Sequence, residues 1–529
     1  MAVDEMNSWN FMPRSLSAYD VNLVNGFLPL EEPISRLPDL YYKPWEDLAA
    51  EVVHLQLAGI FRQRVLKLPQ LSTHRLTNLR EYQRACVLLS FLSHSYVWGH
   101  NQPAEEILPP CLAVPWCEVS RYVGISPIVT NATVVLWNWR LFEKNAALDL
   151  QNLATQLTFT GSIDESWFYL VSTAIEAKSG EMLRSIGRMI NASIHDNKQV
   201  AIESLNNLTS TINEVTKILA RMYEKNDPYL FYWKTRQYLA GWENMKDAGL
   251  ENGIIYKDAK VYDPNGDCNT PVNSFKKFSG GSAAQSSTIQ IIDIALGVKH
   301  YPDNQGLSED FNQNVQNDKK IATSEIAQRR NHTFQQAPGN PYLLKMREYM
   351  PYSHRQFLTD LGNTCNFREY VLINTLDVSD ISPTQFSESI NIAESVPATN
   401  QKSNSSISVQ KDLLKAYNRC VSALKTFRDA HIDIVRIYIV NQAKSTVNPT
   451  TNRSLKPTPA PAAPVAPAPA PAPVTPAPAA DTQSKSPNPA SVNGLAKQVD
   501  DDQTVLGTGG TDAISFLKHV RDETISTRL

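Results

Sequence analysis

Apolar residues recur at intervals of three and four positions along most of this 529-residue chain. That spacing places them on one face of an α-helix, whereas a half-buried strand would need strict alternation. Alternating patterns are rare and short, and the chain contains no internal repeat. We therefore predict a mainly α protein. The clearest predicted helices span residues 44–68, 79–98, 166–194, 208–226 and 411–443.

A run of proline and alanine over residues 457–480 interrupts this pattern late in the chain. Such a run can neither continue a helix nor pair in a sheet, and it has no large side chains to bury. We predict an extended, solvated tether over 446–503. Recognition of the run as a proline-rich ligand is disfavoured, because basic and aromatic anchor residues are nearly absent from it.

The residues after the tether again show sequence patterns typical of folded structure. A Gly-Thr-Gly-Gly-Thr loop precedes Asp512, which is a suitable helix N-cap, and apolar side chains then recur at helical spacing. We predict a lid loop and a C-terminal helix over 504–529, docked on a large helical domain. A polar stretch near 155–162 predicts a boundary between a smaller, mostly helical N-terminal cap domain (1–158) and that large domain (159–445).

Composition narrows the functional class. Charged residues make up 19% of the chain and the net charge is −3, without the clustered basic face that nucleic-acid binding needs. The six cysteines form no Cys-x-x-Cys pair, which argues against structural zinc and a disulfide framework. No secretory leader and no run of 18 apolar residues is apparent. We therefore expect a soluble protein of the reducing cytoplasm.

Three segments hold candidate functional residues. His354 follows Pro351 in a predicted helix, where a neutral imidazole among apolar neighbours could be an axial haem ligand or simply a buried core histidine. Small residues at 280–284 allow a flat ligand to approach the backbone, although a tight loop with helix caps explains them equally well. The third segment holds Phe231, Tyr232 and Arg236. Its rings and guanidinium could hold an aromatic amino acid, or form a core stripe beside a solvated arginine.

Taken in order, these segments resemble signatures of the indoleamine 2,3-dioxygenase family of haem enzymes. The resemblance covers nearly the whole chain except the tether and residues 299–340, and the Pro/Ala insert indicates a fungal member. It implies a haem dioxygenase that uses O₂ to cleave the indole C2–C3 bond of L-tryptophan to N-formylkynurenine, on the kynurenine route towards NAD. The matching stretches are LFYWKTRQYLAGW, GGSAAQSS, MREYMPYSHRQFL, LPDLYYKPWEDLA, SYVWG, LAVPWC and GTGGTD.

The resemblance also implies roles for individual residues. His354 matches the proximal ligand of a ferrous haem b, with Asp293 as a supporting residue on the same side. Arg236 would bind the tryptophan carboxylate and Phe231 the indole ring. The implied partners are tryptophan, O₂ and an electron donor, and we expect a monomer. The other implied site residues are Tyr232, the distal Ser172, Ser282 and Ala283 beside the haem edge, Asn131 in the indole pocket, and Thr508, which would close over the substrate.

Asn131 departs from the tyrosine that animal members of the family carry in the pocket. A shorter, polar side chain there would enlarge and wet the indole pocket, so we expect weaker substrate binding or a different preferred indole. Two other functions stay open from sequence alone. One is a haem protein of the same fold that has lost useful dioxygenase activity and acts as a sensor or binding protein. The other is a helical scaffold without haem, whose tether recruits partners.

The tether itself is expected to be passive. Loop-closure entropy grows only slowly with loop length, so a long insert need not keep the C-terminal segment from the large domain. We predict that deleting residues 448–498 leaves tryptophan turnover within a few-fold of the full-length value, measured as steady-state product formation. A complete loss of turnover in the shortened chain would show that the tether has an active role.

Overall fold

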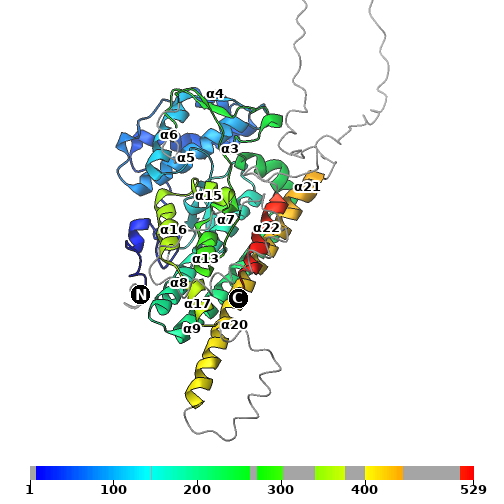
Figure 1. Cartoon of the computed structure of the whole chain (residues 1–529). Helices are drawn as coiled ribbons and strands as arrows, with labels where there is room; N and C mark the ends of the chain where they lie inside the picture. The colour runs from blue at the N-terminus through cyan, green and yellow to red at the C-terminus, as the bar shows by residue number, and fades with distance from the viewer. Residues whose placement is uncertain (1–7, 145, 263–270, 302–339, 376–399, 445–512) are drawn as a thin grey trace, which may run out of the picture.

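The computed structural model describes residues 8–144, 146–262, 271–301, 340–375, 400–444 and 513–529. Over these residues the chain is mainly helical, as predicted (Figure 1). The predicted tether, the lid loop and Thr508 lie outside the described residues. None of the described helices combines the length and the apolar character needed to cross a lipid bilayer.

The N-terminal part is built around one long helix, α5 (Leu79–Trp98), as predicted over 79–98. Asn78 caps its start by accepting a hydrogen bond from the backbone N–H of Glu81, and Gly99 ends it with a φ of +57°. The single helix predicted over 44–68 is instead three short ones, because Gly59 adopts a φ of +70° between the last two. The other elements of this part are η1 (Leu16–Tyr19), η2 (Leu40–Tyr42), α2 (Lys43–Ala50), α3 (Val52–Leu57), α4 (Phe61–Val65), η3 (Thr73–Arg75), β1 (Ile107–Leu108), α6 (Pro110–Val123), η4 (Ala132–Leu136), β2 (Trp139–Leu141) and β3 (Leu153–Thr155).

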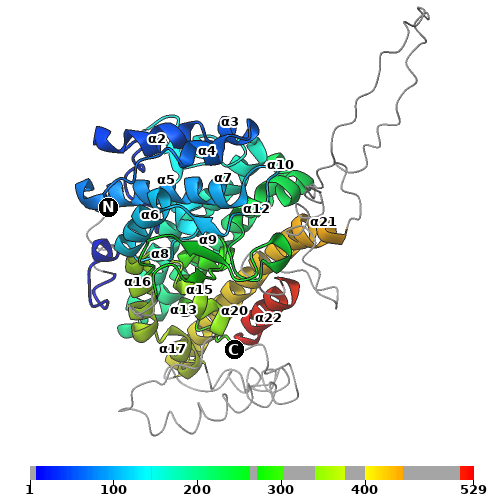
Figure 2. The same ribbon diagram turned by 90° about the horizontal axis from the view of Figure 1, so that it is seen from above.

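The remaining helices form a second group below α5 in Figure 1. α20 (Asn400–Val435) packs along α9 (Lys198–Ala220) on one side and α22 (Ala513–Ser526) on the other. α13 (Ser287–Leu296) lies between α20 and α16 (Tyr352–Thr364) in both views (Figures 1 and 2). The other elements are α7 (Ile163–Ala177), α8 (Ser179–Ile194), α10 (Met222–Lys225), α11 (Pro228–Leu230), η5 (Phe231–Thr235), α12 (Arg236–Leu239), η6 (Lys246–Ala248), β4 (Ile254–Tyr256), β5 (Phe275–Lys276), η7 (Ala283–Gln285), α15 (Pro341–Arg347), α17 (Phe367–Ile373), η9 (Arg436–Val440) and α21 (Asn441–Lys444).

Two small sheets connect distant segments. β1 pairs in parallel with β4, with Ile107 opposite Ile255, and β5 adds an antiparallel edge. β2 and β3 pair antiparallel, with Trp139 opposite Thr155. The first sheet therefore joins the N-terminal part to a segment near residue 255, across the predicted boundary at residue 158. That boundary stays a prediction.

His94 in α5 ties the N-terminal part to the helices below it. Its Nδ1 donates to the carbonyl of Tyr238 at 2.8 Å, and its Nε2 accepts from the backbone N–H of Val129 at 2.9 Å. Both ring nitrogens are therefore satisfied by backbone groups in the neutral form. Burial lowers the pKa of this imidazole to about 3. His94 is thus a structural residue that fixes the segment before Asn131 relative to α12.

We predict that His94 makes the folded protein sensitive to acid. The unfolded chain takes up a proton on this histidine below about pH 6.5, whereas the folded protein does so only near pH 3. Stability is therefore lost as the pH falls from 6.5 towards 3, by about 1.4 kcal/mol per pH unit. In urea titrations at pH 6.5 and 4.5, His94→Gln should lose less unfolding free energy than wild type. His54→Gln, at an exposed position, should keep the wild-type slope, and equal slopes for all three proteins would contradict the prediction.

Candidate active site

An aromatic wall forms where three segments far apart in the sequence meet. Asp227 caps α11 by accepting hydrogen bonds from the backbone N–H groups of Tyr229 and Leu230, and the chain then widens into the π turn η5. The ring of Phe231 in this turn lies 4.6 Å from that of Phe168 on α7 and 5.8 Å from that of Tyr438 on η9. η9 and η4 are π turns as well, and such turns are frequent at functional sites.

Arg236 directly follows the π turn that holds Phe231, as the first residue of α12. Its side chain is 3% exposed, and its guanidinium carbon lies 5.2 Å from the centre of the Tyr232 ring, one turn earlier. Burial lowers the pKa of Arg236, but arginine starts so far above neutrality that the group stays charged. A buried guanidinium next to aromatic rings is suited to a molecule that carries both a carboxylate and an aromatic ring.

One face of α7 adds polar groups to the same region. Ser172 lies one turn after Phe168, and its hydroxyl donates to the Phe168 carbonyl at 3.1 Å, so its oxygen can still accept a hydrogen bond. One turn further, the buried carboxylate of Glu176 accepts hydrogen bonds from the hydroxyls of Ser286, at 2.6 Å, and Thr288. Burial raises the pKa of Glu176. This acid connects α7 to the start of α13.

Asn131 takes part in this polar cluster. Its side-chain amide donates to Glu176 at 3.4 Å, and its backbone N–H donates to the side chain of Gln285 at 3.0 Å. The amide of Asn131 is therefore directed at a buried acid on α7. The expected enlargement and wetting of the indole pocket stays a prediction.

The small-residue run packs against the end of α12. The N–H of Gly281 donates to the carbonyl of Leu239 at 3.0 Å, and a Cβ on Gly280 would come within 2.3 Å of that same carbonyl oxygen. Glycine is therefore required for this approach. Ser282 caps η7 by accepting from the N–H of Ala284, and Ala283 is exposed. The run thus contacts the backbone of Leu239, which follows Arg236 by three residues in α12.

His354, the iron ligand predicted from the sequence, lies among core residues beside the N-terminal segment, and its role as ligand stays a prediction. Its ring is 1% exposed and packs 5.0 Å from the ring of Phe27 in the N-terminal segment. Burial lowers its pKa to about 4, and the nearby charged groups are Asp20 and Arg80. The ring is enclosed by protein, and it belongs to α16, which lies apart from α12, the helix that begins with Arg236 (Figure 2). A porphyrin could reach it only by displacing the N-terminal segment.

His431 on α20 has the surroundings that His354 lacks. It lies seven residues before Tyr438, about two helical turns, on the helix that continues into the aromatic wall. Burial lowers its pKa to about 4, helped by the positive charge of Arg428, and yet the side chain is only half-buried. The ring of His431 is thus partly accessible, whereas that of His354 is enclosed. The structure therefore favours His431 over His354 as an axial ligand.

The donor set around His431 fits a haem. No group of three or more His, Cys, Asp or Glu that could hold a bare metal ion occurs among the described residues. A porphyrin supplies four nitrogen ligands itself and needs one neutral imidazole from the protein. A buried imidazole that stays neutral well below pH 7 meets that need.

Asp293 does not contact His354 in the structure. Its carboxylate accepts two hydrogen bonds from one guanidinium nitrogen of Arg428, at 2.7 and 2.8 Å, and Arg428 lies one turn before His431. Arg428 lowers the pKa of Asp293 against the effect of burial. The support of Asp293 for a haem ligand stays a prediction, and its observed contact leads to α20, the helix that bears His431.

Sequence reasoning missed His431, Glu176 and the role of His94. All three lie within predicted helices, so their segments were recognised but their side-chain environments were not. For His431, the available signal was its place between Arg428 and Tyr438 on one side of a long amphipathic helix.

Comparison with known proteins identifies the family of the chain. The family model described as indoleamine 2,3-dioxygenase matches residues 15–527. The chain is 33% identical to indoleamine 2,3-dioxygenase of Saccharomyces cerevisiae, over 97% of this chain and 93% of that protein. It is 29% identical to human indoleamine 2,3-dioxygenase 2, over 98% and 96%, and to 6-hydroxytryptophan 2,3-dioxygenase of Fusarium equiseti, over 97% and 98%.

A match that runs from the N-terminal segment to the last helix includes every element of the site described above. The chain therefore belongs to the indoleamine 2,3-dioxygenase family of haem-dependent dioxygenases.

Proposed function

We propose that the protein binds a haem b through His431 and cleaves the indole C2–C3 bond of L-tryptophan with O₂, giving N-formylkynurenine. The observation that supports this most directly is the position of Arg236 beside an aromatic wall, one residue of which lies on the same helix as His431. Arg236, the aromatic wall and His431 would thus supply a carboxylate anchor, a ring-binding surface and an imidazole ligand to one site.

When bound, ferrous haem supplies the binding and activation of O₂, which no protein side chain can provide. The protein has to hold the substrate. Arg236 would bind the carboxylate through charge-assisted hydrogen bonds, and Phe231 and Phe168 would pack against the indole. Indole is electron-rich, so the reaction needs no strong protein base. Two fixed points on one substrate restrict its orientation, which is the main contribution expected of these residues.

Ser172 would assist through its hydroxyl oxygen, which is free to accept a hydrogen bond from the substrate side. The buried hydrogen-bonded acid Glu176 would hold Asn131 and the start of α13 in place around the pocket. Thr508 stays a candidate for contact with the substrate amino and carboxylate groups on the strength of the family resemblance alone.

We also propose that the protein acts as a cytoplasmic monomer with an electron donor that keeps the iron ferrous, and that it serves the kynurenine route towards NAD. The sequence supports these points by its composition, by the lack of coiled-coil heptads and by the family resemblance.

The test is a visible spectrum of the purified protein under reducing conditions, with and without tryptophan, followed by identification of the product. We expect a haem Soret band that shifts on addition of tryptophan, and formation of N-formylkynurenine from tryptophan and O₂. A colourless protein after reconstitution, or a haem protein that never converts tryptophan, would overturn the proposal.

A further inference from the structure

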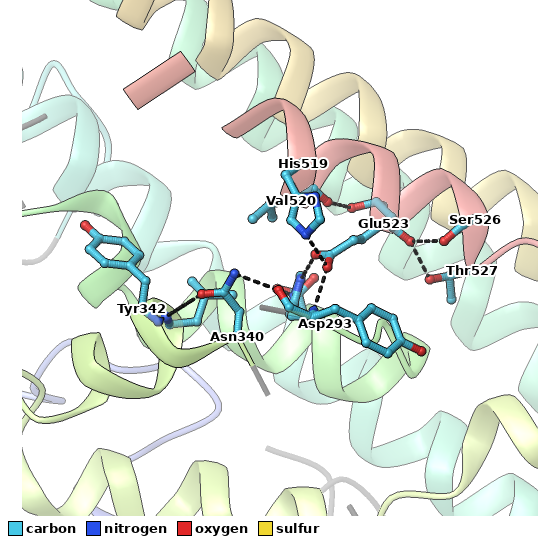
Figure 3. A network of polar contacts seen from close by, with 12 residues as sticks. Asp293, Asn340, Tyr342, His519, Val520, Glu523, Ser526 and Thr527 are labelled. Carbon is cyan, nitrogen blue, oxygen red and sulfur yellow. Dashed lines mark hydrogen bonds and ion pairs between the residues drawn. The ribbon is translucent and has the colours of Figure 1, made fainter. Parts of the chain in front are cut away.

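The C-terminal helix α22 docks on the protein through a buried acid. Glu523 is 2% exposed, and its carboxylate accepts hydrogen bonds from Nδ1 of His300 and from the backbone N–H of Tyr301, both at 2.6 Å. Nε2 of His519, one turn earlier on α22, lies 2.9 Å from the same carboxylate (Figure 3). Gly297, with a φ of +64°, ends α13 and turns the following residues towards α22.

The contacts continue from α22 to the helix that bears His431. Nε2 of His300 lies 3.3 Å from Asp293 on α13, whose carboxylate pairs with Arg428 on α20. The Arg428 guanidinium also donates to the hydroxyl of Thr524 on α22. We call Asp293, His300, Arg428 and Glu523 the charge cluster. It joins α13, α20 and α22 one helical turn from the proposed haem ligand on α20.

With His519 neutral, the four residues of the charge cluster are electrically balanced when His300 is protonated. It then contains two carboxylates, one guanidinium and one imidazolium, which sum to zero. Other charged or titratable groups near it are His519 on α22, Arg347 on α15, His431 on α20, and Lys299 and Tyr301 beside His300. Burial alone would lower the pKa of His300, but Asp293 and Glu523 together raise it above its usual value.

We propose that protonated His300 is a positioning residue of this enzyme. It balances the buried charge cluster and so holds α22 against α13 and α20. The contact on α20 is made by Arg428, one helical turn before His431. Loss of its proton leaves a buried net negative charge beside the helix that bears the ligand. That charge weakens the docking of α22. It also favours the ferric over the ferrous state of a haem bound at His431, so it lowers the reduction potential. This second consequence rests on the proposed function, and the first does not.

The direction of the pH effect follows from the raised pKa. The stabilising contribution of His300 is complete below about pH 6.5 and is lost as the pH rises through the pKa of the folded protein. We therefore expect the docking of α22 to weaken on the alkaline side of neutrality.

The experiment measures hydrogen exchange of the α22 backbone amides in the full chain between pH 6 and pH 9, corrected for the intrinsic pH dependence of exchange. In wild type, protection of α22 should fall by at least about tenfold across this range, the scale of one pKa unit. His300→Gln keeps a hydrogen-bond donor but carries no charge, so its protection should be low at every pH. His54→Gln, at an exposed histidine, should behave as wild type.

The double variant His300→Gln with Glu523→Gln removes one positive and one negative charge, so the cluster is balanced again. Its α22 amides should regain protection relative to His300→Gln and show no pH dependence. The proposal is overturned if wild type and His300→Gln share one pH profile, or if the double variant is no better protected than the single one. For the haem-loaded protein, the reduction potential should fall in His300→Gln and recover in the double variant. Because exchange needs no haem, a failure there is distinguishable from a failure of the proposed function.

Discussion

Replacing His431 with alanine is expected to yield a purified protein with little or no Soret absorbance, whereas His354→Ala should retain it. The iron of a haem held between helices needs one protein nitrogen. Among the histidines of the described residues, only His431 combines a neutral imidazole with a partly uncovered surface near the aromatic wall. His354 is enclosed by the ring of Phe27 and neighbouring core residues. Its removal should instead lower the unfolding free energy by about 2–4 kcal/mol, as for other large-to-small core changes.

The measurement is the ratio of Soret to protein absorbance after reconstitution with haem, with circular dichroism to show that each variant is folded. Added imidazole should restore part of the Soret band to His431→Ala, because the free ligand can occupy the space that the side chain leaves. The opposite pattern, with haem lost from His354→Ala and kept by His431→Ala, would restore the sequence-based choice of ligand.

The helices of this protein are largely predictable, because their signals are local. The range 79–98 coincides with α5, since Asn78 and Gly99 mark its two ends. The range 411–443 lies within the continuous helix from α20 to α21. Where prediction joined separate helices, as over 166–194, the structure interrupts the helix at Lys178 without a glycine or proline to signal the break.

The composition of the site is predictable in part. Phe231, Tyr232 and Arg236 lie within five residues of one another, so helical periodicity was enough to place them together. The iron ligand is harder to predict from the sequence, because every helix has several faces. Only the packing of the whole chain decides which face stays accessible to a ligand. His354 and His431 are both in amphipathic helices, but their surroundings differ. Phe27, more than three hundred residues earlier in the chain, packs against His354. Tyr438, on the helix of His431, packs against the distant Phe231.

Buried polar clusters were the least predictable part. The carboxylates of Glu176 and Glu523 each accept hydrogen bonds from segments more than a hundred residues away in the sequence, which no local pattern reveals. Both acids join helices that surround the proposed site. The sequence shows them only as acidic residues on predicted helices, and such residues are usually solvated.

Arg236→Leu is expected to raise the KM for L-tryptophan by at least about tenfold, the scale of one charged hydrogen-bond pair. Leucine keeps much of the aliphatic packing against Tyr232 but cannot bind a carboxylate. Lys234→Leu is the matched control, because it removes an exposed cation two residues away on the same helix and should leave the KM unchanged.

Tryptamine separates loss of the carboxylate contact from general damage to the pocket, because it has the indole and the amine of tryptophan but no carboxylate. If Arg236 binds the carboxylate, turnover of tryptamine by wild type should already be poor, and Arg236→Leu should change kcat/KM for tryptamine by less than about threefold, within the spread of an uninvolved contact. Equal losses for tryptamine and tryptophan would mean that the guanidinium shapes the aromatic wall. An unchanged KM for tryptophan would remove Arg236 from the substrate site altogether.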